Sequence, residues 1–315
     1  MIMLGYNNIT IISRKTTLPG EFISCRHYTD INSAFNDQNY DAAFICTPTA
    51  LHVQELINVL RHKVKLVYLE KPVSNTLQKI GQVKELAATY DNRIVVGYDL
   101  RFDPGMQQVK QLLQEDSIGK VISVSVFVGQ SLPQWRPYED HRQGMSASKE
   151  KGGGVLLDLI HEVDYLYALF GDVEDVCCHL SNSGVLEIET EESADVLLKF
   201  INGISTTVHL DYLQQQLKRF AIITGTKGTI TWNLAERYVH SINRNAEETE
   251  FNYKDFDRND RFKKIVRTFL EGKNDERFAS LDDGIKSLEI VVAAKHATKN
   301  NSLVKIADVR NNHAE

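Results

Sequence analysis

Residues 152–166 (GGGVLLDLIHEVDYL) hold the densest group of side chains that could do chemistry. Asp158 and His161 are three positions apart, a spacing that predicts one shared helix face, and Asp164 follows on the same stripe. A histidine beside a carboxylate can transfer protons near neutral pH. A hydrogen-bonded polar patch on a buried helix gives the same pattern. For a single His–Asp pair with no further evidence, this structural interpretation is favoured over a catalytic one. No metal site is predicted, because too few ligands are local.

A lysine follows the apolar run 65–69 and Glu70, and a proline comes directly after it. Pro72 fixes the backbone that presents Lys71. A lysine placed in this way could bind a hydroxyl or carbonyl oxygen and lower the pKa of a substrate alcohol. A lysine at a strand end is usually a solvated charge, but the proline and a ligand-binding edge would favour a functional role.

The first hundred residues alternate short apolar strands with amphipathic helices. Strands are expected at 8–13, 41–46, 65–69 and 93–97, and helices at 50–60 and 76–90. This order indicates a parallel sheet covered by helices, with ligands at the carboxyl ends of the strands. The polar or turn residues at those ends should share one edge: Ser13, Arg14, Lys15, Cys46, Thr47, Pro48, Glu70, Lys71 and Tyr98.

The second part of the chain has a different pattern. A helix is expected at 104–114, and glycines followed by a helix at 152–170. Further strands are expected at 121–128, 194–200, 204–210, 220–224 and 229–232. Asn202-Gly203 indicates a hairpin, and Ser280 with Asp283 resembles a capping box that opens a last helix ending near Thr298. The pattern predicts an α+β domain with a mainly antiparallel sheet.

The composition excludes several classes of protein. The 315 residues suit two domains, with 42% hydrophobic and 25% charged residues as in globular proteins. A net charge of −6 gives no basic surface for nucleic acid. The four cysteines show neither disulfide nor zinc spacing, which favours a reducing, cytoplasmic compartment. No apolar run predicts a membrane span, and the start lacks the pattern of a signal peptide.

Two further groups of residues could bind ligands. Arg14 and Lys15 follow the first expected strand, where basic residues can bind an adenosine 2′-phosphate; a surface turn explains them equally well, and we favour NADP over NAD. Trp135, Arg136 and Tyr138 lie in a long loop and suit contact with a sugar or a carboxylate. Packing of the loop against the domain is an alternative of nearly equal weight.

Four motifs in order resemble the Gfo/Idh/MocA family, which includes glucose–fructose oxidoreductase and inositol dehydrogenase. They are ICTPTALH at 45–52, EKP at 70–72, GYDLRFDP at 97–104, and WR at 135–136 followed by GGGVLLDLIHEVD at 152–164. The resemblance implies a Rossmann-like NAD(P)-binding domain over 1–103. It also implies an α+β domain for substrate binding and oligomerisation over 104–315.

The resemblance further implies an NAD(P)-dependent oxidoreductase that moves a hydride to or from a ring carbon of a sugar, polyol or sugar nucleotide. His161 would be the general acid/base, Asp158 would orient it or contact substrate, and Lys71 would polarise the reacting oxygen. The cofactor would meet the strand-end residues given above together with His52. The substrate would meet Arg101, Trp135, Arg136, Tyr138, Asp158 and His161. A homodimer or homotetramer would form through the outer face of the second sheet.

The beginning of the chain departs from the family pattern. Members start with a strand, a G-x-G-x-x-G loop and a helix, whereas residues 1–6 here resemble the end of that helix. Without those glycines the main pyrophosphate anchor is missing. Strands 8–13 and 41–46 would then face a gap, unless they pair directly. The start could lie upstream, or the chain could be a remodelled, non-catalytic sugar-binding or regulatory relative. A metal-dependent hydrolase or lyase is a third alternative.

Overall fold

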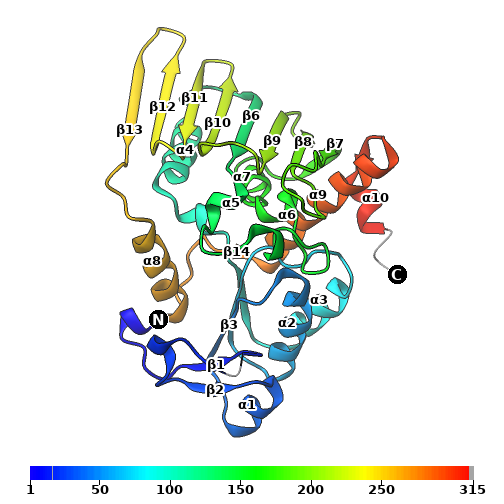
Figure 1. Cartoon of the computed structure of the whole chain (residues 1–315). Helices are drawn as coiled ribbons and strands as arrows, with labels where there is room; N and C mark the ends of the chain where they lie inside the picture. Colours follow the sequence, from blue (N-terminus) through cyan, green and yellow to red (C-terminus); the bar gives the residue numbers. More distant parts are fainter. Residues whose placement is uncertain (16, 312–315) are drawn as a thin grey trace.

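The computed structural model describes residues 1–15 and 17–311 and contains two main sheets (Figure 1). The first sheet has the order β14-β5-β4-β3. Strands β3 (Ala42–Ile45), β4 (Leu66–Leu69) and β5 (Arg93–Val96) are parallel, as predicted. The short strand β14 (Ala279–Ser280) comes from late in the chain and pairs antiparallel with β5. The last part of the sequence therefore returns to complete the sheet of the first part.

Helices α2 (His52–Arg61) and α3 (Ile80–Thr89) connect these parallel strands. The expected start of the second helix near residue 76 is wrong. Lys79, directly before α3, has the left-handed backbone conformation with φ 62° and ψ 7°, so no continuous helix can pass through it.

A separate two-stranded parallel sheet joins β1 (Thr10–Ile12) to β2 (Arg26–Tyr28), and helix α1 (Ile31–Asp37) follows. Within the described ranges, no strand pairing joins β1 to β3. These two strands therefore do not pair directly, so one of the two arrangements considered above does not form. Residues Ile2–Leu4 make one turn of 3₁₀ helix.

The second sheet has nine strands in the order β13-β12-β11-β10-β6-β9-β8-β7-β15, and only β6 and β9 run parallel to each other. Three of its longer strands were missed in the sequence, because their apolar alternation is weak. The strands are β6 (Val121–Gly129), β7 (Val173–Ser181), β8 (Ser193–Phe200), β9 (Ser205–Asp211), β10 (Lys218–Gly225), β11 (Gly228–Asn233), β12 (Tyr238–Asn243), β13 (Glu248–Asn252) and β15 (Val304–Lys305). The missed ones are β7, β12 and β13.

Helices cover one face of this sheet. Helix α4 (Pro104–Gln114) packs on β11 and β12, and α9 (Leu281–Asn300) packs on β7. Along β8, Ala194, Val196, Leu198 and Phe200 are buried while the residues between them are partly or fully exposed, so the other face stays open. The other helices after α4 are α5 (Leu132–Trp135), α6 (Val155–Asp158), α7 (His161–Phe170), α8 (Arg258–Leu270) and α10 (Ile306–Asn311).

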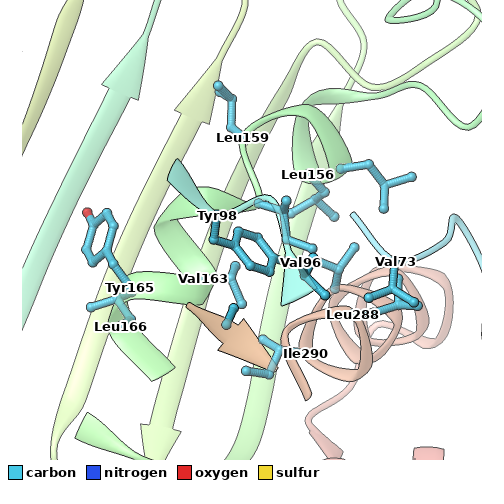
Figure 2. Packing of buried hydrophobic residues seen from close by; sticks show 14 of the residues in the cluster. Val73, Val96, Tyr98, Leu156, Leu159, Val163, Tyr165, Leu166, Leu288 and Ile290 are labelled. Atoms are coloured by element: carbon cyan, nitrogen blue, oxygen red, sulfur yellow. The ribbon is translucent and has the colours of Figure 1, made fainter. Parts of the chain in front are cut away.

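Two sequence features fix the position of α9. Ser280 Oγ accepts from the Asp283 amide at 3.1 Å, and the Asp283 carboxylate accepts from the Ser280 amide at 2.9 Å, so the predicted capping box is confirmed. Helix α9 then contacts β5 and β14 of the first sheet as well as β7 of the second, and Leu288 shares an apolar cluster with Val96 (Figure 2). Among the residues that the structure describes, no helix is long and apolar enough to cross a membrane.

Candidate active site

The glycine-preceded helix is broken into two. We expected one helix with Asp158 and His161 on one face, but α6 ends at Asp158 and α7 begins at His161. Gly154, directly before α6, has φ 111°, and a Cβ added there would lie 2.3 Å from Glu191 Oε1. Glycine is therefore needed at this turn. The prediction of a shared helix face is wrong, and the carboxylate and the imidazole contact different partners.

Lys71 extends from the end of β4 to the junction of α6 and α7. Its Nζ donates to the main-chain oxygen of Asp158 at 2.6 Å. An ammonium has three N–H donors, so two remain for a ligand. The charge of Lys71 is also the second cause, after burial, that lowers the pKa of His161. The structure thus brings Lys71, Asp158 and His161 together.

The carboxylate of Asp158 is oriented by a tyrosine. Tyr212, at the end of β9, is fully buried and donates its hydroxyl to Asp158 Oδ2 at 2.7 Å. The ring of Trp135 meets Tyr212 edge to face, with 5.5 Å between centroids, and Trp135 Nε1 is buried without a partner in the described residues. Trp135 therefore lies on the Asp158 side of the site. Tyr212 was missed, because no motif surrounds it.

The His161 side chain is mostly buried, at 12% exposed, and its Nε2 lies 3.5 Å from Asp99 Oδ1. Its ring meets Tyr98 edge to face at 5.8 Å. Burial lowers the pKa of His161 well below its usual value, and the positive charges of Lys71 and nearby arginines lower it further. His161 is accordingly neutral at physiological pH. Its Nδ1 is shielded from solvent and has no partner among the described residues.

Tyr98 occupies the core rather than the ligand edge. Its side chain is 2% exposed and lies in the apolar cluster with Val96 and Val163 (Figure 2). We had expected it to contact the cofactor. Its position suits a supporting role for the His161 ring instead.

Arg101 is held in a buried ion-pair network. Its guanidinium donates to both oxygens of Asp164, at 2.8 and 2.9 Å, and to Asp283 at 3.3 Å. Its side chain is 8% exposed. The expected substrate contact is not supported by this geometry, so we leave Arg101 out of the site. Burial raises the pKa of Asp164 to about 6, although Arg101 opposes the shift.

The turns after β3 and β4 are joined by His52. Its Nδ1 lies 2.6 Å from the Pro72 oxygen and its Nε2 lies 2.8 Å from the Thr47 oxygen. Both ring nitrogens are thus used within the protein, and the side chain is 1% exposed. His52 was expected at the cofactor, but it holds the two turns together. The hydroxyl of Thr47 is buried without a partner among the described residues.

The remaining expected residues lie apart from this cluster or on the surface. Cys46, Pro48, Arg14 and Lys15 are exposed, and Ser13 Oγ accepts from the Lys15 amide at 3.2 Å. In the loop, Arg136 pairs with Glu139 at 3.8 Å and Tyr138 is 79% exposed. Glu70 is half-buried beside Lys71, and burial raises the pKa of its carboxyl.

The fold places the chain in a class of proteins that carry an NAD-binding Rossmann domain. The family model described as "Oxidoreductase family, NAD-binding Rossmann fold" matches residues 11–98. The model of the GFO/IDH/MocA C-terminal domain matches residues 106–231. The chain belongs to the GFO/IDH/MocA family of NAD(P)-dependent oxidoreductases, as the motifs had indicated.

Curated relatives and solved structures agree with this assignment. The chain is 24% identical to 2,7-anhydro-N-acetylneuraminate hydratase of Escherichia coli, over 68% of this chain but 57% of that protein. It thus spans less than two thirds of this relative. Myo-inositol 2-dehydrogenase of Thermotoga maritima is 26% identical over 90% of this chain and 84% of its own.

Solved structures with lower identity show the fold. Myo-inositol 2-dehydrogenase of Lactobacillus plantarum has a TM-score of 0.76 at 19% identity, covering 94% of this chain and 91% of its own. The WlbA dehydrogenase of Bordetella pertussis, in complex with NADH and UDP-GlcNAcA, has a TM-score of 0.73 at 21% identity. That match covers 89% of this chain and 84% of WlbA.

Proposed function

We propose that the chain transfers a hydride between a nicotinamide cofactor and a ring carbon of a sugar, polyol or sugar nucleotide. The hydrogen bond from Lys71 to the Asp158 carbonyl, beside a mostly buried His161 whose pKa is lowered, is the observation that carries this proposal. A cationic donor beside an uncharged imidazole, at the strand ends of an NAD-binding fold, supports hydride transfer coupled to proton transfer. A relative named as a myo-inositol dehydrogenase and a similarly folded dehydrogenase in complex with UDP-GlcNAcA support this substrate class.

The residues at the nicotinamide end fit NAD(P). Lys71 has donors to spare, and the buried Thr47 hydroxyl lacks a partner, as a ligand contact would. The cofactor, when bound, would supply the hydride acceptor or donor. Arg14 and Lys15 are exposed after β1 and could meet a 2′-phosphate, so we propose NADP as the preferred form. The sequence contains no G-x-G-x-x-G motif, and we assign no pyrophosphate contact.

Each of the three central residues has a separate role in the proposed reaction. Lys71 would hold the reacting oxygen and stabilise negative charge on it. His161 would accept the hydroxyl proton during oxidation and return it during reduction. Asp158 would position Lys71 through its carbonyl and use its carboxylate, oriented by Tyr212, to bind a substrate hydroxyl. Trp135 and Arg136 would flank the substrate.

The test is a binding and turnover experiment with the purified chain. NADH and NADPH are titrated with nicotinamide fluorescence as the signal, and NAD⁺ and NADP⁺ are then offered with polyols, aldoses and UDP-sugars. Reduced nicotinamide that forms with one substrate class supports the proposal. Sugar binding without cofactor binding or turnover would support the non-catalytic alternative instead.

We also propose the assembly and the compartment. The open outer face of the nine-stranded sheet would join subunits in a homodimer or homotetramer. The four cysteines are all free, which supports a cytoplasmic location. We retain 1–103 and 104–315 as the proposed domains, with β14 added to the first sheet from the second.

A further inference from the structure

The carboxylate that faces the proposed catalytic histidine is not that of Asp158, the residue paired with it in the sequence motif. The carboxylate of Asp158 accepts from the Tyr212 hydroxyl. The carboxylate that faces the imidazole is that of Asp99, with Oδ1 3.5 Å from His161 Nε2. Asp99 follows β5, whereas His161 begins α7, so this pairing is invisible in the local sequence pattern.

The position of Asp99 is fixed by an arginine from a third element. Arg261 on α8 lies 2.6 Å from Asp99 Oδ2 and, through its other terminal nitrogen, 2.6 Å from Asp103 Oδ2. The Arg261 and Asp99 side chains are 6% and 7% exposed. A buried guanidinium that contacts both carboxylates limits their rotation. Asp99 therefore presents Oδ1 to His161.

We propose that Asp99, held by Arg261, is a positioning residue that fixes His161 as the Nε2–H tautomer and leaves Nδ1 as the proton acceptor. A neutral imidazole carries one N–H, and the other nitrogen keeps a lone pair. A carboxylate opposite Nε2 attracts the N–H and repels a lone pair there. The depressed pKa of His161 supports the neutral form, and its Nδ1 has no competing partner among the described residues.

The catalytic consequence rests on the proposed function. During alcohol oxidation, the substrate O–H bond breaks and an Nδ1–H bond forms on His161. The hydride on the carbon that carries this oxygen passes to the nicotinamide, and the C–O bond becomes a C=O bond. His161 is then an imidazolium, and the Asp99 carboxylate stabilises it without taking the proton. Reduction reverses each of these steps.

Asp103 provides a matched control, because it shares Arg261 with Asp99 at the same 2.6 Å distance. No hydrogen bond or ion pair joins Asp103 to His161 among the described residues. Asp99→Asn and Asp103→Asn each remove one carboxylate charge from the same guanidinium. Only the Asp99→Asn substitution can turn an amide N–H toward Nε2 and favour the Nδ1–H tautomer.

The decisive measurement is nitrogen NMR of the whole chain labelled with ¹⁵N-histidine, in which His161→Gln identifies the His161 signals. The wild type should show a protonated Nε2 and an unprotonated Nδ1. Asp99→Asn should shift the population to Nδ1–H, and Asp103→Asn should leave it unchanged. A wild type with protonated Nδ1, or an unchanged tautomer in Asp99→Asn, would overturn the proposal. The wild-type spectrum still decides the tautomer if Asp99→Asn does not fold.

The second measurement is steady-state turnover, with the substrate that the function test identifies. Asp99→Asn should lower kcat on the order of 10²–10⁴-fold with little change in KM for the cofactor, as a wrong tautomer does in a His–Asp pair. Asp103→Asn should remain within a few-fold of wild type. Equal kcat in wild type and Asp99→Asn would end the positioning role. The expected tautomer without wild-type turnover would contradict the proposed function and leave the tautomer assignment standing.

Discussion

The ammonium of Lys71 lies 2.6 Å from the main-chain oxygen of Asp158 and donates to it. This hydrogen bond links the end of β4 in the parallel sheet to the end of α6 on the second sheet. The acceptor is a backbone carbonyl, so the contact depends on where α6 ends and not on the Asp158 side chain. The break between α6 and α7 therefore helps to position Lys71.

Replacement of Lys71 by alanine should lower turnover with a substrate identified as above. The lost donor would have stabilised charge on the reacting oxygen, and a preorganised donor of this kind contributes on the order of 10²–10³-fold in kcat. Steady-state kinetics check this. Lys263→Ala is the control, because Lys263 is a surface lysine paired only with Asp260. Equal kcat in both variants would remove Lys71 from the proposed mechanism.

Replacement of His161 by alanine should lower turnover on the order of 10²–10⁴-fold while cofactor affinity changes little, because proton transfer is lost. Single-turnover kinetics and NADPH titration separate the two effects. His240→Ala on the β12–β13 hairpin is the matched histidine control. A His161→Ala variant with wild-type turnover would rule out the acid/base role.

The fold was largely predictable, because burial follows local periodicity. The helix expected at 104–114 is α4 with the same bounds, and the capping box of α9 forms as expected. Strand β13 (Glu248–Asn252) was not predictable, because every residue in it is exposed and pairing with β12 alone holds it. β14 was missed for a different reason: it has only two residues, and they pair with a strand from much earlier in the chain.

The site was predictable in part. Lys71 and His161 stand in motifs, and the rule that ligands bind at the carboxyl ends of parallel strands brings Lys71 to the site. The groups that orient these residues come from distant segments, so spacing gave no signal for Asp99, Arg261 or Tyr212. Long-range pairs of this kind depend on how the two sheets pack, which local patterns do not specify.

Replacement of Arg101 by methionine should destabilise the fold by about 3–5 kcal/mol near pH 8, because a buried Asp164 carboxylate would lose its partner. The pKa of Asp164 is already raised to about 6, so the folded variant can take up a proton at lower pH. The loss should therefore be smaller near pH 5. Urea unfolding at both pH values checks this, with Arg142→Met in an exposed ion pair as the control. An equal loss at both pH values would contradict the assignment.

Acid should destabilise the protein through His52, which is buried, and His161, which is mostly buried. Burial lowers the pKa of His52 and of His161 in the folded state. Below about pH 6.5 the unfolded chain takes up protons that the folded chain resists, so the free energy of unfolding falls as pH falls. The slope can reach about 1.4 kcal/mol per pH unit for each group. His52→Leu and His161→Gln should each flatten the slope between about pH 7 and pH 5, as measured by urea unfolding. An unchanged slope in both variants would exclude this origin of acid sensitivity.

The open face of the nine-stranded sheet should hold subunits together. Phe127 stacks on His209 and on Phe220 across neighbouring strands, with centroids 4.7 and 5.6 Å apart, and Leu197 on β8 is 56% exposed. These apolar and aromatic side chains lose contact with water when a second copy packs on them. Light scattering should give a multiple of the 35.8 kDa chain mass. Leu197→Lys should shift the mass toward the monomer, because it places a charge in that interface. Leu303→Lys is the control, since Leu303 is another exposed leucine just before β15, and this variant should keep the wild-type mass. A wild type that scatters as a monomer at micromolar concentration would show that this face is solvent-exposed in the working protein.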